Sequence, residues 1–165
     1  MLKKCLSVFI TLAVLGSPLV LSECPGGFVH NGDSCYLFSI LRVSWIQAMK
    51  FCEIYQGELA VIETEAEQLF LESYLNSTWK NANQTNVWIS GTDLLVDGEW
   101  IWAKEGRSID YFRWAPGQPD SASMNLGGED CIELVRGSNF MWNDAPCQKH
   151  INFVCERPFM VSADS

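Results

Sequence analysis

Residues 129–147 have the sequence EDCIELVRGSNFMWNDAPC, and this stretch says more about the fold and its chemistry than any other part of the chain. Its segment 131–135 is short and largely apolar, which predicts a strand. Oxygen-bearing side chains flank that strand, with Glu129 and Asp130 before it and Asn143 and Asp144 after it. Ca²⁺ takes about six to eight oxygen ligands at about 2.3 to 2.6 Å, so a site must gather such side chains from separate segments. The stretch therefore predicts part of a calcium shell.

A third group of oxygen atoms precedes this stretch at Gln118-Pro119-Asp120. It belongs to an irregular region, residues 103–130, that shows little periodicity and is interrupted by several glycines and prolines. A long irregular segment inside a compact domain is usually functional or disordered. The acids embedded in this one favour a functional loop, and we expect it to complete the calcium shell.

The N-terminal residues 1–22 have the pattern of a secretion signal, with Lys3 and Lys4 ahead of an apolar run and small residues near Ser22. The run is broken by Gly16 and Pro18 and is too short for a comfortable membrane span, so we expect no membrane insertion. We expect one domain over residues 23–158 and a short tail over 159–165. Loss of the signal removes two lysines and no acids, which moves the formal charge from −9 to −11.

Such an acidic chain disfavours nucleic acid as a partner, because phosphate recognition needs clustered Lys and Arg. It suits divalent cations, cationic surfaces or plain solubility. Of the seven cysteines, Cys5 lies in the signal and six remain, which predicts a disulfide framework with 15 formal pairings. A zinc site is disfavoured, since no Cys-x-x-Cys pair exists and His30 and His150 stand alone.

Two helices are predicted in the first half of the domain. Ser44 is a suitable N-cap for the first, which Gly57 would stop. The second begins at a capping box, Thr64-Glu65-Ala66-Glu67. The apolar positions expected to face the core are Trp45, Ala48, Met49, Cys52 and Ile54 or Tyr55 in the first helix, and Leu69, Phe70 and Tyr74 with Ser73 in the second. Between the helices, residues 59–62 predict a buried strand.

The polar stretch 76–86 predicts an exposed loop, and it holds two N-glycosylation acceptors, Asn76 and Asn83. Beyond it, strands are predicted over residues 87–89, 100–102, 131–135 and 152–155. Helices followed by strands indicate an α+β domain. Among the tryptophans, Trp45, Trp88, Trp100, Trp102 and Trp114 are expected in the core, Trp142 beneath the ligand loop, and Trp79 has no predicted place.

The order and spacing of these features resemble a C-type lectin-like domain over Cys24 to Glu156. The matching motifs are Cys24-Pro25 with Cys35-Tyr36, Trp45 with Ala48 and Cys52, Val87-Trp88-Ile89-Ser90-Gly91, Trp114, Trp142-Asn143-Asp144, Cys147 and Phe153-Val154-Cys155-Glu156. Within the family the chain is most similar to small secreted invertebrate lectins of the perlucin type. The resemblance implies two helices, small antiparallel sheets, a long calcium-binding loop region and three disulfides, Cys24 with Cys35, Cys52 with Cys155, and Cys131 with Cys147.

The resemblance also implies the site. A cis bond before Pro119 would direct the side chains of Gln118 and Asp120 toward calcium, and Glu129, Asn143 and Asp144 would complete the ion's protein ligands. The sugar would contact Gln118, Asp120, Glu129 and Asn143. Asp93, Asp97, Glu129 and Asp130 match ligands of an auxiliary calcium ion, although Ser121 replaces one acid expected there. For Asp93 and Asp97 a solvated turn is the alternative interpretation.

Relatives with Gln-Pro-Asp generally prefer galactose or N-acetylgalactosamine, so the expected function is a secreted, calcium-dependent lectin for galactose-type glycans, as on microbial surfaces in innate immunity. Residues 121–126 lack the aromatic residue that galactose-binding members usually place after the turn. The alternative function is an extracellular matrix or biomineralisation protein that binds protein or calcium carbonate, and homo-oligomers remain open. An enzyme is disfavoured, because no Ser-His-Asp, Cys-His or Gly-x-Ser-x-Gly arrangement can be argued from the chain.

Overall fold

The computed structural model describes residues 23–80, 85–121 and 128–160. The predicted signal 1–22, the acceptor Asn83 and the last five residues of the predicted tail lie outside this part. The helices are α1 (Trp45–Ile54) and α2 (Glu65–Thr78), with a short 3-10 turn at Arg136–Ser138. The strands are β1 (Val29–Asn31), β2 (Ser34–Val43), β3 (Glu58–Leu59), β4 (Val87–Thr92), β5 (Ile101–Trp102), β6 (Arg107–Ser108), β7 (Cys131–Val135), β8 (Met141–Ala145) and β9 (Ile151–Pro158).

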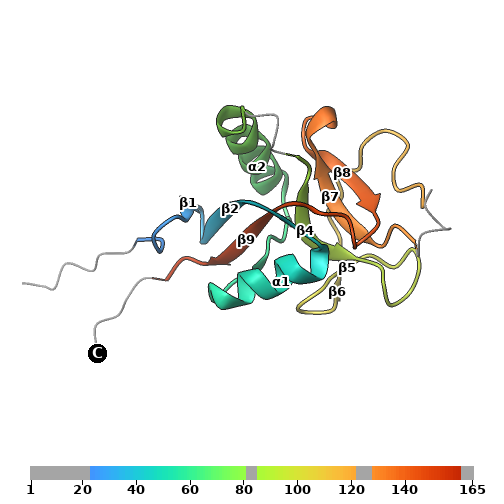
Figure 1. Cartoon of the computed structure of the whole chain (residues 1–165), viewed down its shortest axis with the longest axis horizontal. Coiled ribbons are helices and arrows are strands. Elements are labelled where there is room, and N and C mark those ends of the chain that lie inside the picture. The colour runs from blue at the N-terminus through green and yellow to red at the C-terminus, as the bar shows by residue number, and fades with distance from the viewer. Residues whose placement is uncertain (1–22, 81–84, 122–127, 161–165) are drawn as a thin grey trace, which may run out of the picture.

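The described strands are connected by pairing into one mainly antiparallel sheet. Its main path runs β1-β2-β9-β4-β5-β6, while β3 pairs with β9 and β7 and β8 extend from β4. All pairs are antiparallel except β4 with β9, where Val87 lies opposite Asn152. β7 and β8 pair without a break from Cys131 opposite Ala145 to Val135 opposite Met141. The described ends of the chain lie at one end of the molecule in Figure 1, and the long loops lie at the other.

The two helices lie on either side of the β2–β9 pair, which divides the core into two clusters (Figure 1). α1 contributes Trp45, Ala48 and Cys52 to one cluster, together with Trp88 and Phe153. The other cluster packs beneath α2 and contains most of the remaining aromatic core, with Leu71, Leu75, Trp79, Trp100, Trp102, Phe140 and Trp142 among its members. Of the five tryptophans expected in the core, four are buried. Trp114 is partly buried and packs against the core.

Both predicted helix starts are confirmed, and their caps explain them. At α1 the Ser44 backbone N–H donates to Gln47 Oε1 at 3.1 Å. At α2 the Glu67 N–H donates to Thr64 Oγ1 at 3.3 Å, while the Thr64 N–H donates to Glu67 Oε2 at 3.0 Å. These reciprocal bonds satisfy donors that a helix cannot pair internally.

The predicted loop over residues 76–86 is wrong at its start, because α2 continues to Thr78. The Ser77 and Thr78 hydroxyls donate back to the Tyr74 carbonyl at 2.9 and 2.6 Å, so these polar residues bond within the helix. Trp79 then anchors the end of the helix in the core, where its ring meets Phe140 edge-on. The acceptor Asn76 therefore lies on an exposed helical turn and not in a loop.

The predicted core face of α2 is also wrong in part. Leu69 is exposed, whereas the buried positions are Gln68, Leu71, Glu72 and Leu75. Two of these buried residues, Gln68 and Glu72, are polar, and hydrogen bonds compensate for their burial. Gln68 bonds to the Trp142 indole and to the Glu72 carboxylate. The predicted strand at 59–62 is shorter as well. Only Glu58–Leu59 pair as a strand, while Ala60 and Ile62 continue into the core.

The three disulfides of the resemblance are present: Cys24–Cys35, Cys52–Cys155 and Cys131–Cys147. The second ties α1 to the central strand β9, and the third joins the start of β7 to the segment after β8. Among the described residues no helix combines the length and apolar character needed to cross a membrane.

Candidate functional site

The three predicted ligand segments converge at the loop end of the sheet. Glu129 and Asp130 directly precede β7, and Asn143 and Asp144 lie on its partner β8. The third segment, which leads into the proline turn, runs beside β8. The Ala115 N–H donates to the Trp142 carbonyl at 2.8 Å, and the Trp142 N–H donates to the Arg113 carbonyl at 2.8 Å. The bond between Gln118 and Pro119 is cis. Sheet pairing and the Cys131–Cys147 bridge thus hold all three segments together.

Three carboxylates meet where these segments converge. One oxygen from each of Asp120, Glu129 and Asp144 lies within 4.8 Å of the others, and the side chains run from exposed through half-buried to buried in that order. Unit charges this close repel one another by about 3 to 4 kcal/mol at an effective dielectric constant near 20. A divalent cation would turn that repulsion into attraction, so the donor set suits a hard ion such as Ca²⁺.

Asp144 also fixes the turn that follows Pro119. Its Oδ1 accepts the backbone N–H of Asp120 at 3.2 Å, and its Oδ2 accepts that of Ser121 at 2.8 Å. The side chain is fully buried. Each carboxylate oxygen can accept more than one partner, so these bonds leave room for an ion. Asp144 therefore links β8 to the proline turn.

Gln118 supplies an independent indication of a missing partner. Its Oε1 is buried and has no hydrogen-bond donor among the described residues. A buried acceptor left in this state costs about 1 to 3 kcal/mol. A bound cation is one partner that would satisfy this oxygen, since amide oxygens are ligands that Ca²⁺ accepts.

Asn143 completes the predicted ligand set, and its orientation depends on a residue that sequence reasoning missed. Its Nδ2 donates to Glu133 Oε1 at 3.2 Å and also to the Asp144 carbonyl. Glu133 lies opposite Asn143 in the β7–β8 ladder. The sequence holds a signal for it, since an acid in the middle of a buried strand requires a partner.

The auxiliary set is brought close but does not form an equivalent cluster. Within the described part of the chain, Asp120, Glu129 and Asp144 are the one group of three His, Cys, Asp or Glu side chains whose ligand atoms meet within 4.8 Å. Asp93 is buried at the end of β4, where its Oδ2 accepts the Gly98 N–H at 2.9 Å and its Oδ1 has no described donor. Burial raises the pKa of Asp93, and the charges of Asp130 and Asp97 raise it further. Burial and the Asp97 charge likewise raise the pKa of Asp130.

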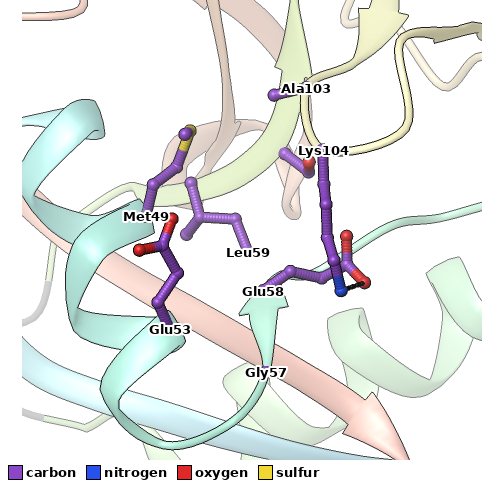
Figure 2. Close-up of a pocket in the computed structure, with 8 residues that line it drawn as sticks. Met49, Glu53, Gly57, Glu58, Leu59, Ala103 and Lys104 are labelled. Atoms are coloured by element: carbon purple, nitrogen blue, oxygen red, sulfur yellow. Dashed lines mark hydrogen bonds and ion pairs between the residues drawn. The ribbon is translucent and has the colours of Figure 1, made fainter.

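A cavity in the described part of the chain lies away from these ligands. It has a volume of about 420 Å³ and lies between α1, β3 and the turn after β5, as Figure 2 shows. Leu59, Met49 and Ala103 give it an apolar lining, and the Glu58 carboxylate at its edge pairs with Lys104 at 3.0 Å. The predicted ligands line none of the described cavities.

Comparison with known proteins assigns this arrangement to a family. The family model for the Lectin C-type domain matches residues 41–157. The chain is 38% identical to Perlucin of Haliotis laevigata over 135 residues, which is 81% of this chain and 83% of that protein. It is 36% identical to the human low affinity immunoglobulin epsilon Fc receptor over 144 residues, 87% of this chain, but spans only 41% of that longer protein.

A solved structure supports the same assignment. The cow C-type carbohydrate-recognition domain of CD23, determined in the presence of a GlcNAc2Man3 oligosaccharide, superposes with a TM-score of 0.72 at 34% identity. The match covers 85% of this chain and 99% of that domain.

Proposed function

The chain belongs to the C-type lectin domain family, and on that premise we propose that it is a secreted protein that binds galactose-type glycans through a calcium ion. Its relatives include carbohydrate-recognition domains and are not enzymes, so the chain is a binding protein. The observation that carries the calcium proposal is the convergence of Asp120, Glu129 and Asp144 on one point. The buried Gln118 Oε1, which has no described donor, supports it independently.

The roles of the individual residues follow from their positions. Gln118, Asp120, Glu129, Asn143 and Asp144 would hold the ion through side-chain oxygens. A bound calcium ion supplies open coordination positions that can take two neighbouring sugar hydroxyls. Gln118, Asp120, Glu129 and Asn143 would also hydrogen-bond those hydroxyls. Galactose is proposed from the Gln118-Pro119-Asp120 order.

Secretion is supported by two features of the chain. Residues 1–22 have the pattern of a signal, and the domain carries three disulfides. Disulfides form and persist mainly in oxidising compartments such as the extracellular space.

Affinity chromatography tests this proposal directly. The secreted protein is applied to galactose-agarose and to mannose-agarose in calcium and then washed with a chelator. We expect retention on galactose, release by the chelator and weaker retention on mannose. Retention that persists in the chelator would contradict the calcium mechanism, and equal retention on both resins would contradict the sugar preference.

A second function is favoured by the acidic composition, with a formal charge of −9. Such a surface could bind a calcium-containing mineral without a defined ion site. The two functions differ in their dependence on Asn143, which carries no charge. Asn143→Ala would abolish sugar retention, whereas adsorption to calcium carbonate crystals through net charge would be unchanged.

A further inference from the structure

Glu133 lies next to the candidate calcium site and is a buried carboxylate outside the predicted ligand set. Its side chain is 2% exposed. It points from the centre of β7 toward β8, where its partner in the ladder is Asn143. Buried carboxylates are costly unless they are paired and hydrogen-bonded, so its contacts show what the residue is used for.

Three side chains from separate segments donate to Glu133. Lys149 Nζ lies 2.8 Å from each of its two oxygens. Asn86 Nδ2 donates to Oε1 at 2.9 Å, and Asn143 Nδ2 donates to the same oxygen at 3.2 Å. A carboxylate can accept hydrogen bonds through both of its oxygens, and Lys149 pairs with both of them.

The bond to Asn143 controls which end of its amide faces the site. A side-chain amide has a donor end and an acceptor end, and Glu133 engages the donor end together with the Asp144 carbonyl. The acceptor end, Oδ1, then remains for a cation. We propose that Glu133 is a positioning residue that orients Asn143 for calcium, with Lys149 holding its carboxylate in place. This inference rests on the proposed function.

Glu133→Gln tests the inference with little change in shape. The new side chain keeps only one acceptor oxygen, so its NH₂ group must face another donor, either Lys149 Nζ or the amide groups of Asn86 and Asn143. A neutral amide oxygen also accepts the Asn143 bond less strongly than a carboxylate does, so the Asn143 amide would be held less firmly with its oxygen toward the ion. Partners of metal ligands typically contribute about 10- to 100-fold to metal affinity, so we expect a loss of that size.

Asn86→Ala is the matched control, because it removes a hydrogen bond to the same Glu133 oxygen without touching Asn143. Calcium affinity is measured by titration calorimetry with Ca²⁺ alone on the full secreted protein. The Tm in chelator is measured in parallel. We expect both variants to lower Tm, but only Glu133→Gln to weaken calcium binding by about tenfold or more.

The outcomes separate this inference from the proposed function. If wild-type protein takes up no Ca²⁺ at millimolar concentration, the proposed function and this inference both fail. If wild type binds and Glu133→Gln binds within about threefold of it, only the inference is overturned. Parallel losses of affinity in both variants, in proportion to their Tm, would give Glu133 a purely structural role. The Asn143 side-chain NH₂ resonances provide a second readout, and we expect Glu133→Gln to shift them in the ion-free protein and Asn86→Ala to leave them nearly unchanged.

Discussion

Asp120 and Asp144 both belong to the carboxylate cluster, but they differ in what else they do. Asp120 is exposed, and one of its carboxylate oxygens lies within 4.8 Å of a carboxylate oxygen of Glu129 and of Asp144. The buried Asp144 also accepts two backbone N–H groups from the proline turn. A change at either residue should therefore affect calcium binding, whereas a change at Asp144 should also affect the ion-free fold.

Asp120→Ala and Asp144→Ala should separate these two roles. We expect both to abolish calcium-dependent retention on galactose-agarose. In chelator, Asp120→Ala should keep the wild-type free energy of unfolding within about 0.5 kcal/mol, as exposed substitutions usually do. Asp144→Ala should lose about 1 to 3 kcal/mol, because it leaves polar groups at the turn without partners.

Urea unfolding in chelator measures the two free energies. Asp33→Ala, an exposed acid in the turn between β1 and β2, is the control and should change neither sugar retention nor stability. An Asp120→Ala protein as unstable as Asp144→Ala would show that the proline turn depends on Asp120 for its structure.

At the scale of elements, the β7–β8 pair is the frame of the site, and the Cys131–Cys147 bridge closes it. The bridge spans a sequence separation of 16, and the Cys24–Cys35 bridge spans 11 at the other end of the molecule. Loops of this size predict about 3 kcal/mol for each bridge in the chain-entropy model. The two bridges should therefore contribute similar stability but differ in their effect on the site.

Removal of each bridge in turn tests that difference. Cys131→Ala with Cys147→Ala should lower the free energy of unfolding by about 2 to 4 kcal/mol and weaken calcium binding. Cys24→Ala with Cys35→Ala should lose similar stability and keep wild-type calcium affinity. Denaturant unfolding and calcium titration on both double variants provide the comparison, and equal calcium affinities would show that strand pairing alone aligns the ligands.

The elements also show which features the sequence could predict. The helix starts at Ser44 and Thr64 are local chemistry, as is the strand over 131–135, and all three are confirmed. The buried face of α2 depends instead on long-range polar contacts. Gln68 can be buried there because it accepts a hydrogen bond from the Trp142 indole, 74 positions along the chain. A hydrophobic pattern cannot reveal such a bond.

The site shows the same division. The acids of the candidate site could be found from sequence because a calcium site needs several oxygen-bearing side chains. The orientation of Asn143 could not, because it depends on the β7–β8 register that sets Glu133 opposite it. The segment that carries Asn143 and Asp144 was expected to be a loop, and it is the strand β8 because it pairs with β7.

At the scale of the whole molecule, the candidate site and the chain ends lie at opposite ends of the sheet (Figure 1). Glu156 on β9 belongs to the end without the site. Its carboxylate accepts hydrogen bonds from Ser34 Oγ at 2.6 Å, Tyr36 Oη at 3.3 Å and the Val61 N–H at 2.9 Å. It thereby joins β2, β9 and the segment after β3, and its titration should affect folding without involving calcium.

Burial raises the pKa of Glu156 above its ordinary value of 4.5, and the charge of Glu67 adds to the rise, while the three hydrogen bonds oppose it. A raised pKa means that the folded chain holds this proton more tightly than the unfolded chain. Stability from Glu156 is therefore fully present below about pH 4.5 and is lost as the pH rises through the folded pKa. Glu156→Gln removes this pH dependence, so the Tm of the variant should gain on that of wild type between pH 4 and pH 8.

Calorimetry in chelator at several pH values measures this difference. Each kcal/mol that ionisation of Glu156 costs the fold corresponds to roughly 2 to 4 °C in a domain of this size. The variant has one acceptor oxygen fewer, so one donor loses its partner and the Tm of the variant can be lower than that of wild type at every pH. The quantity that tests the idea is therefore how the Tm difference between variant and wild type changes with pH. Glu53→Gln, an exposed carboxylate on α1, is the control and should give a constant difference. A Tm difference for Glu156→Gln that stays constant would show that folding leaves the pKa of Glu156 unchanged, and one that moves in favour of wild type as the pH rises would show that the fold stabilises the ionised carboxylate.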